Sequence, residues 1–276
     1  MEKMNYADYV SVIDKLKQQH KRTETNNFVL ADKFKELLEV GNCWGIATSG
    51  CVFVAVPRHD TFYQLYYHAV GSDDIAEGLH LIDEQYGEEL PLSCTVIGKE
   101  RYVEEIVPVF LNAGYKLRKK IRRYNIVYVQ KAKTWETTAR FACNEDAEEI
   151  FELLTNNFDI YSEQIPSVDE IRQNAEKEQI VVVRCDNKIA TLSYFEIHNK
   201  TLHRIFDYTR PEYRKSLIYL GIEPFLERVF EEKNIKINRS YGWRDMENKK
   251  LNRISEMFNN IAEDVVLYTV KKSYDR

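Results

Sequence analysis

The sequence predicts a mixed α/β (α+β) fold built from two similarly arranged modules. Stretches with helical spacing alternate with runs rich in β-branched and aromatic residues, and the same order of elements starts again after a polar stretch around residues 131–140. A chain of 276 residues, 44% of them hydrophobic, is long enough to bury two cores. We therefore expect modules at residues 1–133 and 134–276, each a mostly antiparallel mixed sheet flanked by helices.

The first module is expected to open with two helices and to continue into a sheet. Tyr9, Ile13 and Leu16 lie at helical spacing, and Ser49-Gly50 forms a hairpin turn between two apolar runs. Gly114 is a good stop for a helix that contains Pro108. The expected order is helices 6–19 and 29–38, a hairpin 44–56, a strand 62–70, a helix 72–86, a strand 92–97, a helix 101–114 and a strand 115–130.

The second module repeats this order. The turn of its hairpin is expected at Asp186-Asn187, and its third strand carries His203 and Asp207. We expect one long helix from Pro211 to Lys233. The other expected elements are a strand 138–143, helices 144–158 and 167–178, a hairpin 180–197, a strand 202–208, a strand 237–243, a helix from residue 248 with Leu251, Ile254, Met257 and Phe258 on its apolar side, and a strand 264–270.

Composition narrows the classes of function. A net charge of -5 and a pI near 5.8 lack the basic excess of a nucleic-acid-binding protein, so we do not expect nucleic acid as a partner. No apolar run is long enough to cross a bilayer, and the N-terminus lacks the apolar core of a secretion signal, so we expect a cytoplasmic protein without a membrane partner. The five scattered cysteines form no C-x-x-C pair, so we predict neither a metal site nor disulfides.

Three local sequences in the second module resemble the GNAT acyltransferase superfamily. TRPEYRKSLIYLG, from Thr209, is similar to the loop and helix that bind the pyrophosphate of acyl-coenzyme A. ENKKLNRISEMF, residues 247–258, is similar to the Asn-headed helix beside the acyl-transfer site, and the hairpin 180–197 is the third match. The first module resembles a diverged copy of the second. The resemblance implies an N-acyltransferase that uses acetyl-CoA or another acyl-CoA, with a small-molecule or peptide amine as acceptor.

The same resemblance implies which residues hold the cofactor. The family pattern is Gln/Arg-x-x-Gly-x-Gly/Ala, and this chain keeps the arginine but has Leu217 and Tyr219 where small residues belong. Strand amides near Tyr208 would polarise the thioester carbonyl. The implied cofactor-binding residues are Tyr208, Arg214, Lys215, Ser216, Leu217, Ile218, Tyr219 and Asn248.

Catalytic and substrate-binding residues are expected around the third strand of the module. Many members of the superfamily use a tyrosine as general acid where this chain has Ser255, so Tyr208 and Tyr241 are candidates to replace it. Asp207 is the candidate general base, and a spacing of four along the strand predicts His203 on the same side. Glu196 and His198 on the preceding strand should face one way, so we expect a cross-strand cluster that binds the acceptor, made of Glu196, His198 and His203.

Two other functions stay open at this point. The substitutions at Leu217, Tyr219 and Ser255 favour a non-catalytic binding or scaffold protein of the same fold. A transferase could instead use another carrier, an aminoacyl-tRNA or an acyl carrier protein, with the basic run LRKKIRR at residues 117–123 as docking patch. The first module carries Asp73-Asp74 where a phosphate loop would lie, so we expect it to be structural or to shape the substrate site. A homodimer is also left open.

Overall fold

The computed structural model describes residues 2–87, 90–126 and 137–274, which form two compact units. Unit 1 comprises Met1–Ile121 together with Asp264–Arg276, and unit 2 comprises Arg122–Glu263. The expected boundary between residues 133 and 134 lies outside the described residues. The C-terminal strand, which we expected to close the second module, belongs to unit 1 from Asp264 onward.

Unit 1 contains the expected helix, helix, meander, helix, strand, helix order. Its strands follow the order β1-β3-β4-β5-β6-β13, with β5 and β6 parallel, and the short β2 pairs with β5. The elements are β1 (Glu2–Lys3), α1 (Tyr6–Gln19), β2 (Glu24–Thr25), α2 (Ala31–Val40), β3 (Trp44–Ala47), β4 (Cys51–Arg58), β5 (Phe62–Ala69), α3 (Ser72–Gln85), β6 (Leu92–Gly98), α4 (Glu100–Asn112), β7 (Lys116–Ile126) and β13 (Ile261–Lys272); β7 and β13 each run from one unit into the other.

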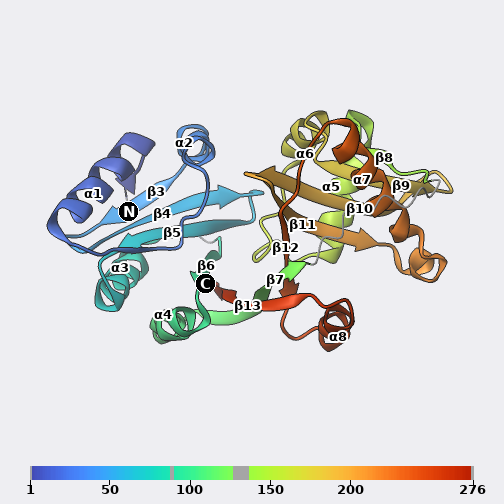
Figure 1. Ribbon diagram of the computed structural model, residues 1–276. Helices are drawn as coiled ribbons and strands as arrows, with labels where there is room; N and C mark the ends of the chain where they lie inside the picture. Colours follow the sequence, from blue (N-terminus) through green and yellow to red (C-terminus); the bar gives the residue numbers. More distant parts are fainter. Residues whose placement is uncertain (1, 88–89, 127–136, 275–276) are drawn as a thin grey trace. The chain divides into compact units, whose positions relative to one another are not determined.

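Helices cover both faces of the sheet in unit 1 (Figure 1). Tyr9 of α1 and Phe34 of α2 pack on Val52 and Tyr66, which point to one face of β4 and β5. On the other face α3 comes so close that a Cβ added to Gly78 would lie 2.5 Å from the Phe53 ring. Successive side chains of the strands thus point to opposite faces of the sheet and pack into two separate apolar layers.

Unit 2 repeats this arrangement with its own core. Its strand order is β8-β9-β10-β11-β12-β7, with β11 and β12 parallel. Val182 and Leu192 pack with α5 and α6, whereas Val181 and Phe195 pack with α7 on the opposite face. The elements are β8 (Arg140–Phe141), α5 (Ala147–Asn157), α6 (Val168–Glu176), β9 (Ile180–Cys185), β10 (Lys188–His198), β11 (Thr201–Thr209), α7 (Ile222–Glu232), β12 (Arg239–Asp245) and α8 (Lys249–Met257), with a 3-10 turn at Asn144–Asp146.

The long helix expected from Pro211 does not form, and that prediction was wrong. The segment instead makes two 3-10 turns, Pro211–Ser216 and Ile218–Gly221, and α7 begins only at Ile222. Leu217 between the turns has φ +56°, a left-handed conformation that an α-helix cannot include. In the described part of the chain, no helix is long and apolar enough to cross a membrane.

The apolar side of α8 is exposed. Its residues Leu251, Ile254, Met257 and Phe258 are 38 to 76% exposed. The helix itself is as expected, because the side chain of Asn248 accepts a hydrogen bond from the N–H of Leu251 at its start.

Candidate functional site

Two parallel strands separate at their carboxyl ends in unit 2. β11 and β12 pair only from Thr201 with Arg239 to Arg204 with Gly242, although both strands continue beyond these residues. On its other edge β11 stays paired with β10 as far as Thr209. Residues 205–209 of β11 therefore lack a described strand partner on the β12 side, although the Thr209 carbonyl accepts a hydrogen bond from Arg214.

Asp207 lies in this separated stretch and is held by its neighbours. Its Oδ1 accepts a 2.6 Å hydrogen bond from the hydroxyl of Ser193 on β10, and the Arg204 guanidinium lies 3.9 Å away. Arg204 is buried and forms an ion pair with Glu223, in the first turn of α7, at 2.5 Å. The Asp207 side chain itself is 54% exposed, so a carboxylate fixed in position remains within reach of a substrate.

His203 does not share a side with Asp207, and that prediction was wrong. A bulge makes Tyr194 and Phe195 of β10 pair with Phe206 and Arg204, so Ile205 has no opposite residue. An extra residue reverses which face the following side chains occupy. His203, opposite Glu196, therefore lies on the face covered by α5 and α6, whereas Asp207, opposite Ser193, lies on the α7 face.

The three residues expected to bind the acceptor do come together, on the α5 and α6 face. His198 Nε2 lies 3.1 Å from Glu196 Oε2, and Glu196 pairs directly with His203. The His203 ring stacks on Tyr241 with ring centroids 4.4 Å apart, and burial lowers the pKa of His203 to about 4. At neutral pH this imidazole is uncharged, and its Nε2 has no hydrogen-bond partner among the described residues.

The candidates for the general acid do not converge on Asp207. Tyr241 belongs to the paired part of β12, where Arg123 also lies over its ring and burial raises its pKa. Tyr208 packs near Phe158 on the α5 and α6 face, opposite to Asp207. Ser255 is buried, and its hydroxyl donates to the Leu251 carbonyl one turn earlier in α8. The Ser255 hydroxyl thus forms a hydrogen bond within its own helix.

The loop after β11 is basic and exposed. Arg214 Nε donates to the Thr209 carbonyl and Ser216 Oγ to the Tyr213 carbonyl, while Lys215 is exposed. Ile218 packs against the core beside α7, whereas Leu217 and Tyr219 are 52% and 42% exposed. These two bulky side chains are therefore not part of the core. Asn248, also expected to bind cofactor, instead caps α8.

The corresponding strand pair of unit 1 is filled by its own chain. β5 and β6 pair in parallel only from Tyr63 to Leu65, and β2 then adds to the far part of β5. The Asn26 side chain spans both strands: its Nδ2 donates to the Leu65 and Thr95 carbonyls, and its Oδ1 accepts from the Tyr67 N–H. No described strand adds to β11 in this way.

The start of α3 in unit 1 differs in charge from the loop in unit 2. As expected, Asp73 and Asp74 lie in its first turn, and Asp74 packs against Gly50. Carboxylates at a helix start repel a phosphate. Among the described residues, a separated strand pair with basic residues beside it occurs in unit 2 and not in unit 1.

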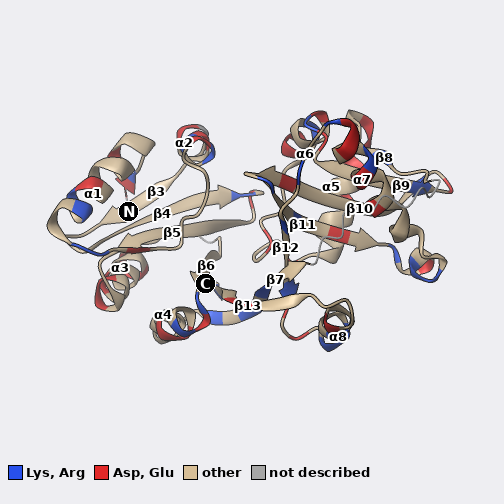
Figure 2. Ribbon diagram, viewed as in Figure 1, with Lys and Arg blue, Asp and Glu red and all other residues tan. Residues whose placement is uncertain are grey.

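The basic run of residues 117–123 lies on β7, which Figure 2 marks as a stretch of Lys and Arg. Part of its charge is already engaged. Arg123 forms an ion pair with Glu263 at 2.6 Å, and Lys120 lies 4.8 Å over the Tyr268 ring. The strand itself is as expected as far as Ile126; residues 127–130 of the expected strand lie outside the described residues.

Two residues at the separated strands were not anticipated from the sequence. Arg244, near the end of β12, has a buried Nη1 without a hydrogen-bond partner among the described residues. The buried Oδ1 of Asn252 in α8 likewise has no hydrogen-bond partner among them. Asn252 Nδ2 donates to the Asp245 carbonyl. Arg244 and Asn252 are single polar residues in amphipathic elements. Their spacing in the sequence is the same as that of ordinary surface residues, so the sequence did not single them out.

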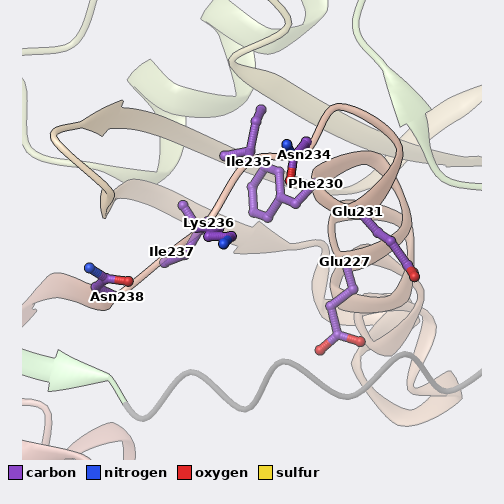
Figure 3. A pocket seen from close by; sticks show the side chains of 8 residues that line it. All are labelled: Glu227, Phe230, Glu231, Asn234, Ile235, Lys236, Ile237 and Asn238. Carbon is purple, nitrogen blue, oxygen red and sulfur yellow. The ribbon is translucent and has the colours of Figure 1, made fainter.

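Other features lie away from these strands. A pocket of about 450 Å³ opens at the end of α7 in unit 2 and contains none of the predicted site residues (Figure 3). Its lining comes from Glu227, Phe230 and Glu231 and from residues 234–238. Over the described residues, no three His, Cys, Asp or Glu side chains gather in a way that could hold a metal ion.

Comparisons with known proteins identify the fold. No protein-family model matches the chain, and no curated protein matches it in sequence. A GCN5-related N-acetyltransferase from Sphaerobacter thermophilus is 11% identical over 99% of this chain and 94% of its own, with a TM-score of 0.59. A tandem GNAT protein from the clavulanic acid biosynthesis pathway is 10% identical over 99% and 98%, also with a TM-score of 0.59.

A third solved structure, from Enterococcus faecalis V583, is described as a probable N-acyltransferase. It is 11% identical over 99% of this chain and 72% of its own, with a TM-score of 0.56. The expected GNAT-like fold in tandem is thereby confirmed, and the chain shares it with acetyltransferases along nearly its whole length.

Proposed function

We propose that the protein is an acyl-CoA-dependent N-acyltransferase, with acetyl-CoA as the first donor to test, and that unit 2 carries the reaction. The observation that carries this proposal is the separation of β11 from β12 beside a carboxylate, Asp207, that Ser193 and Arg204 hold in place. The tandem fold that the chain shares with acetyltransferases supports acyl transfer as the reaction class, and the filled strand pair of unit 1 favours unit 2 as the site.

The donor would lie along the unpaired edge of β11. Backbone N–H groups in residues 205–209 would polarise the thioester carbonyl, and Arg214 and Lys215 would attract the diphosphate.

Asp207 would act as general base. It takes a proton from the ammonium group of the acceptor, and the free amine then attacks the thioester carbonyl carbon. The new N–C bond forms as the C–S bond breaks, and coenzyme A leaves as a thiolate. Because a thiol has a pKa near 8.5, this leaving group departs without a strong acid, which fits the engagement of Ser255 in its own helix.

The substitution Asp207→Asn tests this role. The amide keeps an acceptor for the Ser193 hydroxyl, so we expect an unchanged melting temperature, acetyl-CoA affinity within about twofold, and turnover at least about 100-fold slower. Thiol release with a panel of primary amines measures turnover. Asp169→Asn, an exposed acid of α6, is the matched control and should keep full activity. Undiminished turnover of Asp207→Asn would exclude Asp207 as the base.

A non-catalytic binding protein is the second candidate, favoured by the 3-10 turns that replace a helix start after β11. The two functions differ in their response to acetyl-CoA. A ligand at 100 times its dissociation constant adds about 2.7 kcal/mol of stability. Absence of any thermal shift at millimolar acetyl-CoA would support the second candidate.

A further inference from the structure

Arg244 is a half-buried cation in unit 2 that the proposed reaction does not use. It lies two residues beyond Gly242, the last residue of β12 that pairs with β11, on the same side of the strand as that glycine. Its guanidinium stacks 5.1 Å from the centroid of the Tyr124 ring, and its Nη1 is buried without a hydrogen-bond partner among the described residues. A buried donor left in this state destabilises a protein unless a ligand completes it.

The charges around Arg244 define what it could bind. Burial lowers the pKa of Arg244, but an arginine stays protonated at neutral pH. The charged residues that act on Arg244 are Asp207 and Arg204. Arg204 already has the carboxylates of Glu223 and Asp207 beside it. Arg244 is therefore the cation of this face that would accept an anion, and a planar carboxylate fits a guanidinium.

We propose that Arg244 binds the α-carboxylate of the acceptor, so that the acceptor is a free amino acid whose α-amine faces Asp207. This inference rests on the proposed acyltransferase function. An amino acid carries an ammonium and a carboxylate, the charges that complement a carboxylate and a guanidinium on one face of adjacent strands. The diphosphate of the donor would meet Arg214 and Lys215 after β11 instead, which leaves Arg244 for the acceptor.

The reaction then balances without a further reactant. The ammonium group of the amino acid loses one proton to Asp207, and its nitrogen loses a second as the amide N–C bond forms and the C–S bond of the thioester breaks. One of these two protons ends on the thiolate, and the other is released to solvent. Arg244 takes no part in these transfers; it is a positioning residue that fixes the amine relative to Asp207.

The test compares ligands that differ only in the carboxylate. L-amino acids, their α-amides and the matching amines without a carboxyl group are titrated calorimetrically and then used as acceptors with acetyl-CoA. For the preferred amino acid we expect kcat/KM at least about 10-fold above that of its amide in the wild type. Arg244→Gln should raise KM for the amino acid, so that the kcat/KM values for the amino acid and its amide become similar. Arg253→Gln, on the exposed side of α8, is the control.

Three outcomes overturn the inference. The wild type could bind no amino acid, or it could prefer amides and plain amines. Alternatively, succinyl-CoA could be preferred to acetyl-CoA with plain amines, and Arg244→Gln could abolish that preference; Arg244 would then bind a carboxylate of the acyl group. Failure of the proposed function is a separate result, because it appears as absent acetyl-CoA binding while amino-acid binding is measured independently.

Discussion

Asp146 links three elements of unit 2 through one buried carboxylate. It receives two hydrogen bonds from Arg140, at 2.7 and 3.0 Å, one from Arg184 at 2.8 Å and one from the N–H of Cys143 at 3.0 Å. Burial by itself would raise the pKa of Asp146, but these donors outweigh it and lower the pKa to about 2. The Asp146 carboxylate thus connects the start of α5 to strands β8 and β9.

This pKa gives stability a defined pH dependence. Because the folded pKa of Asp146 lies below its unfolded value near 3.8, its contribution is present above pH 4 and is lost as the pH falls toward 2. We expect Asp146→Asn to lower the unfolding free energy of unit 2 by about 2 kcal/mol at pH 7 and by less at pH 3. Urea unfolding at both pH values measures this, with Asp169→Asn as control. An equal loss at both values would contradict the ion-pair account.

Single residues also explain where sequence reasoning succeeded and failed. The pairing of Glu196 with His198 followed from a spacing of two along a strand and is confirmed. The same logic failed for His203 and Asp207, because Ile205 bulges between them. No sequence pattern marks a bulge without glycine, so the side of every later residue of β11 was unpredictable. Likewise the sequence around Asn26 predicts an ordinary loop residue. Its role in bridging β5 and β6 is evident only from its hydrogen bonds to those strands.

At the scale of elements, the strand pair of unit 1 depends on Asn26. Replacing it by alanine would leave the Tyr67 N–H and the Leu65 and Thr95 carbonyls without this partner inside the core. We expect Asn26→Ala to destabilise unit 1 by about 2–4 kcal/mol while acetyl-CoA affinity stays unchanged. Differential scanning calorimetry and titration measure the two quantities, with exposed Asn112→Ala as control. A negligible loss of stability would contradict the role of Asn26.

Element type was predictable over most of the chain, whereas the segment after β11 was not. Apolar spacing and capping residues predicted helices such as α1 and α6 close to their observed bounds. Residues 211–233 show similar spacing, yet a left-handed Leu217 divides them into 3-10 turns and a shorter helix. A positive φ in leucine depends on the surrounding structure and leaves no trace in composition.

At the scale of the whole molecule, the two units are similar in fold and different in what they offer a ligand. Unit 1 fills its separated strands with Asn26 and carries acids at the start of α3. Unit 2 leaves the β12 side of β11 unpaired beyond Arg204 and has basic residues in the following loop. The repeated order of elements predicted the tandem fold. The sequence did not predict that β13 pairs with β6 of unit 1, because a local pattern does not specify which strand another strand pairs with.

The number of acetyl-CoA molecules bound per chain tests the account most directly. Native mass spectrometry of the intact protein across an acetyl-CoA titration counts them, and we predict saturation at one. Asn26→Ala should keep the same count, because unit 1 holds no donor site to lose. Saturation at two molecules, or no binding at millimolar acetyl-CoA, would contradict the assignment of the acyl-transfer site to unit 2.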